Sequence, residues 1–364
     1  MTLDYLLVGQ GLAGTILSHT LRSAGCATGV VDAARLPSSS RVAAGIFNPL
    51  TGKQPVKTWQ AEALFSFLPP FYREMETRLG ERFFHPKPFY RPFRTVEEQN
   101  RGISLTGSPA LGTWLRSRAT DPETADFLLS HLGGLETLQA GYVAVDRLLR
   151  AYRSQLVSEG MLFDRPFSFD ALQVFPDGVA WQGIRARRLI FCEGSHAVSN
   201  PYFRWLPFRP VKGEILTVEI HARVPDRIFK QGVFLVPQEH GCKVGATYER
   251  NCLGSSPGND FDWQPTPGAR QEMTSTLSTW LKPAYRVLKQ EAGIRPATFD
   301  RRPFIGLHPK YPALGIFNGL GSKGVSIAPY YARHFYEFLE CGKELAGEVN
   351  IRRGFSLHSN ENPC

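Results

Sequence analysis

Residues 4–32 read DYLLVGQGLAGTILSHTLRSAGCATGVVD, and this stretch decides the fold. The apolar run from Asp4 to Val8 predicts a short buried strand. The glycine-rich turn from Gly9 to Gly14 then opens an amphipathic helix that runs to about Ser23. A second apolar run, Thr28 to Val31, ends at Asp32. The stretch therefore predicts a strand-turn-helix-strand unit of the doubly wound kind.

The turn has the spacing Gly9-x-Gly11-x-x-Gly14, with Leu12 and Ala13 between the last two glycines. Glycines let the backbone approach a pyrophosphate, and the N-terminus of the helix offers unpaired N–H groups to its charges. Asp32 stands at the spacing expected of an acid that accepts hydrogen bonds from a ribose. An ordinary turn aspartate at a strand end is the alternative for Asp32. The loop alone leaves NAD and FAD open.

Composition indicates a globular protein of two packed domains. The 364 residues exceed what one core usually organises, and the hydrophobic and charged fractions, 42% and 21%, are ordinary. The net charge of +9 suits an anionic partner, namely a dinucleotide, a carboxylate substrate or nucleic acid. Because the arginines are spread along the chain, nucleic acid is permitted but not required.

The sequence contains neither a signal-peptide pattern at its start nor an apolar run of the roughly 18 to 20 residues that span a membrane. We therefore expect a cytoplasmic protein. Its cysteines are scattered without metal-ligand spacing, so we expect reduced thiols and no metal site. They are Cys26, Cys192, Cys242, Cys252, Cys341 and Cys364.

Further elements follow from periodicity and turn signals. Helices are expected within 62–79, over 146–158 and 267–281, and from Pro329 to Leu339. Strands are expected at 161–163, 189–192, 214–220, 232–236, 243–247 and 316–318. The pattern leaves the nucleotide domain and returns to it, which predicts a discontinuous architecture.

Several segments, in this order along the chain, resemble the D-amino acid oxidase superfamily of FAD enzymes, which includes glycine oxidase and sarcosine oxidase. They are SSSRVAAGIFNP (38–49), RLIFCEGSHA (188–197), RPVKGEIL (209–216), GATYE (245–249), GIRPATFDRRPFIG (293–306) and GLGSKGVSIAP (319–329). The resemblance implies an α/β fold with a Rossmann-like, glutathione reductase-type FAD-binding domain and an α+β substrate domain on an antiparallel sheet. The implied FAD-binding segments are 1–85, 141–205 and 290–364, and the substrate-binding segments are 86–140 and 206–289.

The resemblance also assigns cofactor contacts. The serine-rich turn and the AAG stretch would lie against the pyrophosphate and flavin, although an ordinary polar loop is the alternative. The residues implied there are Ser39, Ser40, Arg41, Ala44, Gly45, Asn48 (near the flavin ring) and Gly194. The C-terminal glycine turn would direct N–H groups from Gly321 through Val325 at the pyrimidine end of the ring, unless it is a plain helix-capping turn. This second set is Gly319, Gly321, Ser322, Lys323, Gly324 and Val325.

Three side chains are catalytic candidates on the same resemblance. Arg295 would bind the substrate carboxylate with two parallel N–H donors and also border the cofactor, with an interdomain ion pair as the alternative. Tyr248 is a second substrate contact, or simply a packed tyrosine. Lys323 would stand near the flavin and favour its anionic reduced form or oxygen activation, or else point to water. No histidine or cysteine occupies the regions where some relatives attach flavin covalently, so the FAD is expected to be non-covalent.

The implied reaction is hydride transfer from the carbon bearing the amine to flavin N5, with O2 or another electron acceptor reoxidising the cofactor. Because the flavin supplies the difficult step, the reaction does not require an obligatory general base. The glycine turn and the AAGIFNP loop also look like the oxidoreductase domain of the bifunctional tRNA enzyme that acts on carboxymethylaminomethyl-uridine. The methyltransferase domain of that enzyme has no counterpart in this sequence. Three hypotheses stay open: a free amino-acid or N-substituted glycine oxidase, a tRNA-modifying oxidoreductase, and a non-catalytic flavin-binding protein. The oligomeric state is also left open.

Overall fold

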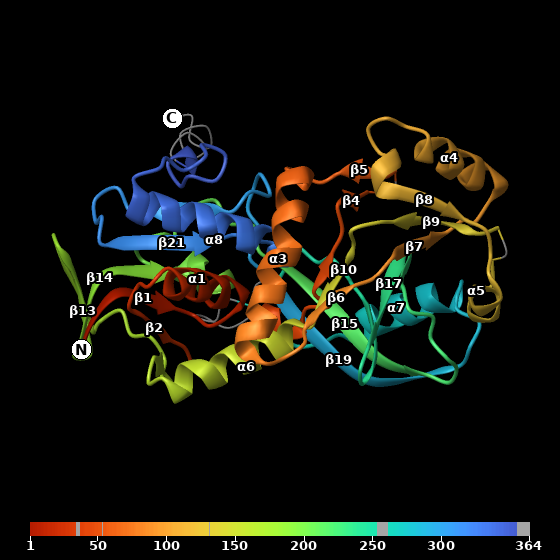
Figure 1. Ribbon diagram of the computed structural model, residues 1–364. Coiled ribbons are helices and arrows are strands. Elements are labelled where there is room, and N and C mark those ends of the chain that lie inside the picture. The colour runs from red at the N-terminus through yellow and green to blue at the C-terminus, as the bar shows by residue number, and fades with distance from the viewer. Residues whose placement is uncertain (34–36, 53, 131, 253–260, 355–364) are drawn as a thin grey trace, which may run out of the picture.

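The structure is a computed structural model that describes residues 1–33, 37–52, 54–130, 132–252 and 261–354. Cys364 lies outside these residues. Figure 1 shows two lobes with helices between them, and the N-terminus lies at the far end of the first lobe. Each lobe is built on its own large sheet.

The sheet of the first lobe has the order β11-β2-β1-β14-β13-β12, and β21 pairs with both β14 and β20. Its strands are β1 (Thr2–Val8), β2 (Thr28–Val31), β11 (Leu162–Phe163), β12 (Leu172–Phe175), β13 (Gly178–Trp181), β14 (Ile184–Phe191), β20 (Phe304–Leu307) and β21 (Leu314–Asn318). Strand β1 is parallel to β2 and to β14, and β14 is parallel to β21. This arrangement confirms the doubly wound unit expected from residues 4–32.

The sheet of the second lobe has the order β19-β15-β18-β17-β16-β7-β9-β8. Its strands are β7 (Phe89–Pro92), β8 (Leu115–Arg118), β9 (Gly134–Thr137), β15 (Val211–Ile220), β16 (Ile228–Gln231), β17 (Val233–Gln238), β18 (Gly241–Gly245) and β19 (Tyr285–Arg295). Neighbours are antiparallel except β16 and β7, which are parallel. The expected α/β class with a second, largely antiparallel sheet is therefore confirmed.

Smaller elements join the two lobes. One short sheet has the order β3-β10-β6, and β4 pairs with β5 in a hairpin. These strands are β3 (Ile46–Phe47), β4 (Leu50–Thr51), β5 (Val56–Lys57), β6 (Phe84–Pro86) and β10 (Gly141–Val143). The 3₁₀ turns are Gly112–Trp114 and Gly194–Ser199.

The helices are α1 (Leu12–Ser23), α2 (Ser39–Val42), α3 (Ala61–Leu79), α4 (Val96–Thr106), α5 (Pro122–Phe127), α6 (Val145–Ser158), α7 (Pro267–Ser278) and α8 (Gly324–Cys341). Among the described residues, no helix has both the length and the apolar character needed to cross a membrane. The expected start of the last helix at Pro329 is wrong, because α8 begins five residues earlier at Gly324. Pro329 lacks the N–H that would bond the Val325 carbonyl. The Tyr72 hydroxyl of α3 donates to that carbonyl instead, at 2.8 Å, so the helix tolerates the proline.

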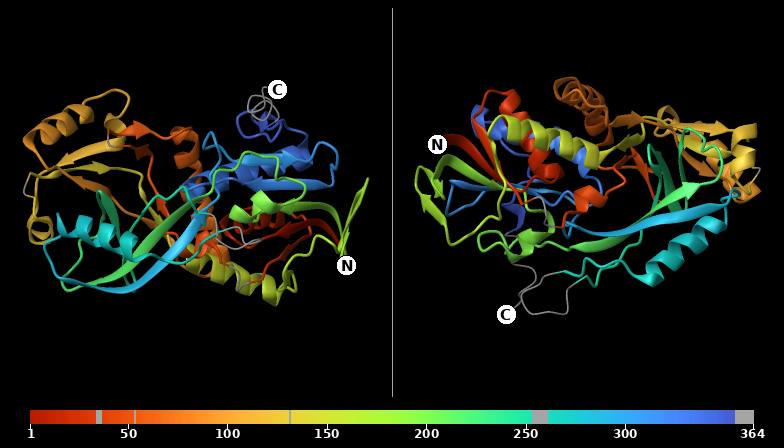
Figure 2. Two further views of the ribbon diagram at one scale, coloured as in Figure 1. Left: turned by 180° about the vertical axis from the view of Figure 1, so that it is seen from behind. Right: turned by 90° about the horizontal axis from the view of Figure 1, so that it is seen from below.

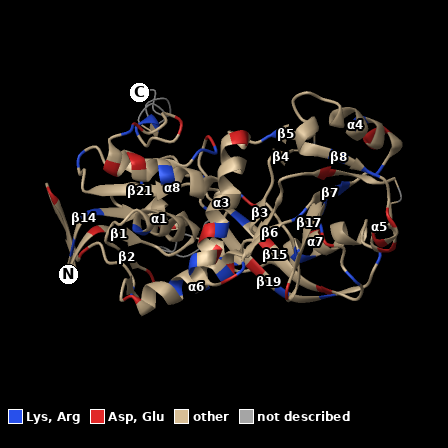
Figure 3. Cartoon of the chain, viewed as in Figure 1, with Lys and Arg blue, Asp and Glu red and all other residues tan. Residues whose placement is uncertain are grey.

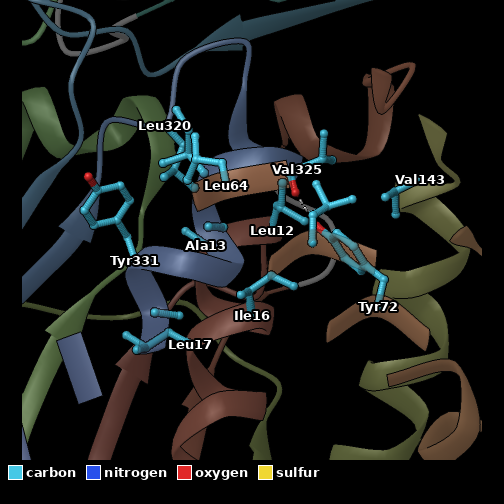
Figure 4. Close-up of a cluster of buried hydrophobic side chains, with 14 of the residues drawn as sticks. Leu12, Ala13, Ile16, Leu17, Leu64, Tyr72, Val143, Leu320, Val325 and Tyr331 are labelled. Atoms are coloured by element: carbon cyan, nitrogen blue, oxygen red, sulfur yellow. Dashed lines mark hydrogen bonds between the residues drawn. The ribbon is translucent and has the colours of Figure 1, made fainter. Parts of the chain in front are cut away.

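The largest core lies where α1, α3 and α8 meet over the first sheet. Figure 4 shows Leu12, Ala13 and Ile16 of α1 gathered in one cluster with Leu64 and Tyr72 of α3 and Val325 of α8. Leu12 and Val325 belong to the first turns of their helices and are both buried. This packing brings the N-termini of α1 and α8 together, although they lie at opposite ends of the sequence.

The domain division expected from the sequence stays a proposal, and one of its boundaries needs correction. Strand β19 pairs with β15 from Tyr285 to Arg295, with one register shift between Thr217 and Val218, so the boundary placed at residue 290 cuts one strand. Residues 290–295 belong to the second sheet, because the hydrogen-bonded ladder carries them there. Figure 2 shows β15 and β19 as a long ribbon pair that runs from the second lobe toward the first. Arg295 ends this strand at the junction of the two lobes.

Two close backbone approaches shape the β1–α1 turn. Gly9 has φ +102°, and a Cβ there would stand 2.6 Å from the Cys192 carbonyl oxygen that follows β14. A Cβ at Gly14 would overlap the Gly9 carbonyl oxygen. Only glycine lets the chain reverse this tightly above the strand ends.

Replacement of Gly14 by Ala is expected to lower the free energy of unfolding by about 2 kcal/mol or more, because the added methyl meets rigid backbone. Urea unfolding followed by circular dichroism measures the change. Gly268→Ala is the matched control, since no atom lies within 4 Å of a Cβ built at this exposed position of α7. Equal stability of the two variants would contradict the close approach.

Candidate functional site

A cavity of 370 Å³ lies between the two sheets. The first lobe supplies the turn between β1 and α1, the end of β2, the loop around α2, the turn after β14 and the turn before α8. The second lobe supplies residues from β15, β17 and β19 and one residue directly after β18, namely Gly213, Ile215, Phe234, Gly293, Arg295 and Ala246. Segments from both ends of the chain therefore share one cavity.

The N-terminus of α1 offers backbone donors to this cavity. The N-cap residue of α1 is Gly11, which has no side chain to bond the first N–H groups of the helix. The Leu12 N–H donates to Ser40 Oγ at 3.1 Å. The N–H groups of Ala13 and Gly14, in the first turn, have no acceptor among the described residues. Unpaired donors at the positive end of a helix dipole form a site for an anion such as phosphate.

Asp32 follows β2 at the opposite side of the turn, as expected of a ribose-binding acid. Its Oδ2 accepts the Gln10 N–H at 2.9 Å, and its Oδ1 accepts a hydrogen bond from Arg153 Nη1 at 3.1 Å. Arg41 Nη2 lies 3.7 Å from the same Oδ1. These contacts fix the carboxylate at the edge of the cavity, where it can accept hydrogen bonds from ribose hydroxyls.

The turn before α8 contributes fewer donors than the sequence suggested. The Gly321 N–H already donates to the Pro296 carbonyl at 3.1 Å, and the Lys323 N–H donates to Leu320 O at 3.2 Å. The expectation that all N–H groups from Gly321 through Val325 face a ligand is therefore wrong for these two residues. Within the described residues, the N–H groups of Gly324 and Val325 have no acceptor.

Glu193 is an acid in the cavity wall that the sequence did not single out. Burial raises the pKa of Glu193 to about 7, and the hydrogen bond from Asn200 Nδ2, at 2.6 Å, opposes part of that rise. The Glu193 carboxyl group therefore stays protonated at pH values at which an exposed glutamate has already lost its proton. A protonated Glu193 adds no negative charge to a cavity whose other features suit an anion.

Arg295 supplies the opposite charge from the second lobe. Its Nη1 and Nη2 donate to the Thr247 carbonyl at 3.2 and 3.3 Å, and burial lowers the pKa of the guanidinium. A Cβ at Gly213 would overlap the guanidinium, so the glycine leaves the space that Arg295 occupies. No carboxylate of the described residues lies within ion-pair distance of Arg295, which excludes the interdomain ion pair within that part of the chain. A half-buried cation without a counter-ion is suited to an anionic ligand.

Most of the site residues expected from the sequence line the cavity. They are Gly9, Gly11, Leu12, Ala13, Asp32, Ser39, Ser40, Arg41, Ala44, Gly45, Gly194, Arg295, Gly321, Ser322, Gly324 and Val325. Gly14, Asn48, Gly319, Lys323 and Tyr248 do not line it. Gly14 still shapes the turn, and Asn48 Oδ1 accepts the Leu50 N–H at 2.9 Å.

Two catalytic candidates lie outside the cavity wall. Tyr248 is 61% exposed. Burial lowers the pKa of Arg295, and the nearby Tyr248 opposes part of that effect. Lys323 is half-buried, and its pKa is lowered by burial and by the nearby Arg301 and Arg302. Their catalytic roles stay predictions.

Other site residues were missed because they come from distant elements. Arg153 of α6 reaches Asp32, and Lys243 of β18 donates to the Val42 and Ala43 carbonyls at 2.9 and 3.1 Å. Lys243 thereby ties the second sheet to the loop after α2, which lines the cavity. Trp263 stacks on His196 with ring centroids 6.0 Å apart, and both line the cavity. A lone lysine in a strand or a tryptophan in a loop carries no sequence signal for these contacts.

Two helix N-termini, an aspartate at the end of β2 and a desolvated arginine surround one cavity, and this combination is typical of dinucleotide-binding proteins of the Rossmann class. The family described as FAD dependent oxidoreductase matches residues 4–337. The chain belongs to this family, and FAD is its cofactor.

Known proteins of this kind resemble the chain in sequence and in fold. It is 30% identical to glycine oxidase of Bacillus subtilis (strain 168) over 165 residues, which are 42% of this chain and 40% of the relative. It is 29% identical to the tRNA 5-methylaminomethyl-2-thiouridine biosynthesis bifunctional protein MnmC of Caulobacter sp. (strain K31) over 129 residues, which are 35% of this chain and 21% of that protein. The chain thus spans less than half the length of these relatives.

The likeness in fold extends over nearly the whole chain. The structure of glycine oxidase from Bacillus cereus ATCC 14579 superposes with a TM-score of 0.78 at 18% identity, covering 94% of this chain and 96% of that one. This comparison concerns the fold alone.

The residues present fit FAD. The first turn of α1 would hold the pyrophosphate through the N–H groups of Ala13 and Gly14, and Asp32 would hold the adenosine ribose. Gly194 lines the cavity with φ +61° and has no atom within 4 Å of a built Cβ, so the wall is open there. No group of three or more His, Cys, Asp or Glu side chains in the described ranges is arranged to hold a metal ion.

Replacement of Glu193 by Gln should change how stability depends on pH. Because the folded-state pKa is raised from 4.5 to about 7, the folded protein binds the proton more tightly than the unfolded chain does. The contribution of Glu193 to stability is therefore present at pH 4.5 and below, and it is lost as the pH rises to about 7. Denaturant unfolding of the FAD-free protein measures this effect. From pH 5 to pH 8, the free energy of unfolding of the wild type should fall by up to about 3 kcal/mol more than that of Glu193→Gln. The same pH dependence in both proteins would contradict a buried, protonated Glu193.

Proposed function

We propose that the chain oxidises the C–N bond of an amino acid or an N-substituted glycine, with the carboxylate of the substrate bound to Arg295. The observation that carries this proposal is the half-buried Arg295 guanidinium, which borders the cavity and has no carboxylate partner among the described residues. A guanidinium matches a carboxylate with two parallel hydrogen bonds, and these are stronger where water is excluded.

The wall around Arg295 supports a small organic substrate. Ile215, Phe234 and Ala246 line the cavity from the same sheet, so an apolar surface adjoins the cationic group. Binding pockets for small molecules commonly combine such a surface with a few placed polar groups. The carboxylate would be fixed by Arg295 while the apolar residues exclude water from the carbon next to the nitrogen.

FAD, when bound, supplies the acceptor for the hydride equivalent that leaves this carbon. The contribution of the chain is binding and orientation: Arg295 holds the carboxylate, and the sheet places the C–H bond over the cofactor site. Tyr248 lies near Arg295 and is a further carboxylate contact in this proposal. Lys323 is proposed to favour the anionic reduced cofactor, because burial and two neighbouring arginines make its own charge costly without an anion nearby.

A second candidate is the oxidation of a carboxymethylaminomethyl group on tRNA. The sequence likeness to MnmC over 129 residues and the net charge of +9 favour it. Figure 3 shows Lys and Arg interspersed with Asp and Glu over both lobes. Nucleic acid usually meets a basic surface patch, so this interspersion favours the free substrate.

Anaerobic reduction of the bound flavin tests the proposal directly. The panel comprises glycine, N-methylglycine and longer N-alkyl glycines, D-amino acids, proline and carboxymethylaminomethyl-modified tRNA. Bleaching by a free amino acid supports the proposed oxidase, whereas bleaching by the tRNA alone, with a steep salt dependence, supports the second candidate. Failure of every amine to bleach the flavin would contradict both and indicate a non-catalytic flavin protein.

Replacement of Arg295 by Met is expected to raise KM for the substrate by about 10- to 100-fold, because a charge-assisted double hydrogen bond is lost. Steady-state kinetics measures the change, and flavin absorbance confirms equal FAD content. Arg286→Met in the same strand is the control, since this exposed arginine pairs with Glu219 at 3.0 Å instead of lining the cavity. An unchanged KM in the Arg295 variant would rule out the carboxylate contact.

A further inference from the structure

A second pair of cations, Arg91 and Lys230, lies on neighbouring strands of the second sheet. Strands β7 and β16 are parallel, with Phe89 opposite Ile228 and Tyr90 opposite Phe229. The next step of this register places Arg91 beside Lys230. Burial lowers the pKa of Lys230, and the charge of Arg91 lowers it further, as expected of side chains that lie close together.

This pair is on the face of the sheet that borders the cavity. Side chains alternate between the two faces along a strand, so Arg91 shares the face of Phe89, and Lys230 shares the face of Ile228. Phe89 and Ile228 belong to the buried cluster that includes Ile215, a cavity residue. Lys230 is also directly opposite Phe234, which lines the cavity. The two cations are not themselves lining residues of the cavity, but they lie on the same face of the sheet, next to Phe234 and away from Arg295.

Neither cation has a carboxylate within ion-pair distance among the described residues. Arg91 donates from Nη1 to Gly52 O at 2.8 Å and from Nη2 to Leu50 O at 3.3 Å, and its buried Nε has no acceptor. Lys230 Nζ donates to the Gly232 carbonyl. Burial lowers the pKa of Arg91, and burial together with the charge of Arg91 lowers the pKa of Lys230 to about 8.

Such an arrangement is costly unless an anion completes it. Two like charges that are partly removed from water repel each other, and here they contact only neutral groups: backbone carbonyls and, for Arg91, the Phe89 ring 5.6 Å away. The unused N–H donors of the guanidinium and the ammonium suit the oxygen atoms of a carboxylate or phosphate.

We propose that Arg91 and Lys230 form a second anion-binding subsite, which holds a distal carboxylate or phosphate of a substrate whose amino-acid carboxylate lies on Arg295. The inference rests on the proposed function and specifies its substrate class: an amine with anionic groups at both ends. A substrate with one carboxylate would leave this subsite without its ligand.

The register sets the length of this substrate. Four strand steps, from β16 through β17, β18 and β15 to β19, separate Lys230 from Arg295. The strand pairing places Lys230 in the same row across the sheet as Ile215 of β15. Arg295 pairs with Val211, which lies four residues before Ile215 on the same strand. At about 4.8 Å per strand and 3.3 Å per residue, the two Cα atoms are roughly 23 Å apart. The lengths of two long side chains leave roughly 10 Å between the two anionic groups, which is about the length of octanedioate.

Calorimetric binding of dicarboxylates to the FAD-loaded enzyme tests the subsite without requiring turnover. Octanedioate is expected to bind about tenfold or more tightly than octanoate, and more tightly than butanedioate, because only octanedioate reaches both cationic sites. Lys230→Met should abolish this advantage and Lys230→Arg should retain it. Lys282→Met, at an exposed lysine of the same lobe, is the matched control and should behave as the wild type. An eight-carbon monocarboxylate with a terminal phosphate distinguishes a phosphate site from a carboxylate site by its affinity relative to octanedioate.

Equal affinities for octanedioate and octanoate, or an advantage that survives Lys230→Met, would overturn the subsite. Flavin reduction by N-methylglycine in the same preparation separates this failure from that of the proposed function. If N-methylglycine reduces the flavin but octanedioate has no advantage, the oxidase proposal stands and the second subsite does not. If no amine reduces the flavin and neither acid binds, both proposals fail.

Discussion

The close approach of backbone to backbone at the β1–α1 turn is the constraint on which the rest of the molecule depends. A side chain at Gly9 or Gly14 would meet a carbonyl oxygen, of Cys192 and of Gly9 respectively. Because Gly9 and Gly14 have no side chains, α1 begins directly above the ends of the parallel strands, where its first N–H groups face the cavity. The packing of α1 on α8 then brings a second helix N-terminus to the same place (Figure 4). The dinucleotide site thus depends on backbone geometry more than on side-chain chemistry.

The second lobe contributes charge where the first contributes backbone donors. Arg295 is held against Gly213 and the Thr247 carbonyl, and Arg91 and Lys230 lie farther across the same sheet. These cations have no carboxylate partners among the described residues, and in both proposals an anionic ligand supplies the balancing charge. The lobes are also connected through Lys243, whose ammonium group is bonded to the loop that lines the cavity. The position of the substrate wall relative to the cofactor site is therefore set by direct contacts.

The sequence predicted those parts of the structure that local patterns determine. The unit in residues 4–32, the long helix after residue 60 and the position of Arg295 at the cavity follow from periodicity, glycine spacing and resemblance. The start of α8 was misplaced, because the tyrosine that compensates for Pro329 comes from α3. The boundary at 290 failed for a similar reason, since only the pairing with β15 shows that β19 continues to Arg295. Arg153, Glu193 and the Arg91–Lys230 pair had no local signal, because each depends on a contact between distant segments.

The most direct test of this account is a titration of the flavin-free protein with FAD, followed by absorbance and by release of the flavin with acid. The account predicts one FAD per chain, recovered free in solution after the protein is precipitated, because the contacts are hydrogen bonds that Asp32 accepts and that the first turns of α1 and α8 donate. A protein that takes up no FAD, or that retains the flavin covalently after precipitation, would contradict it.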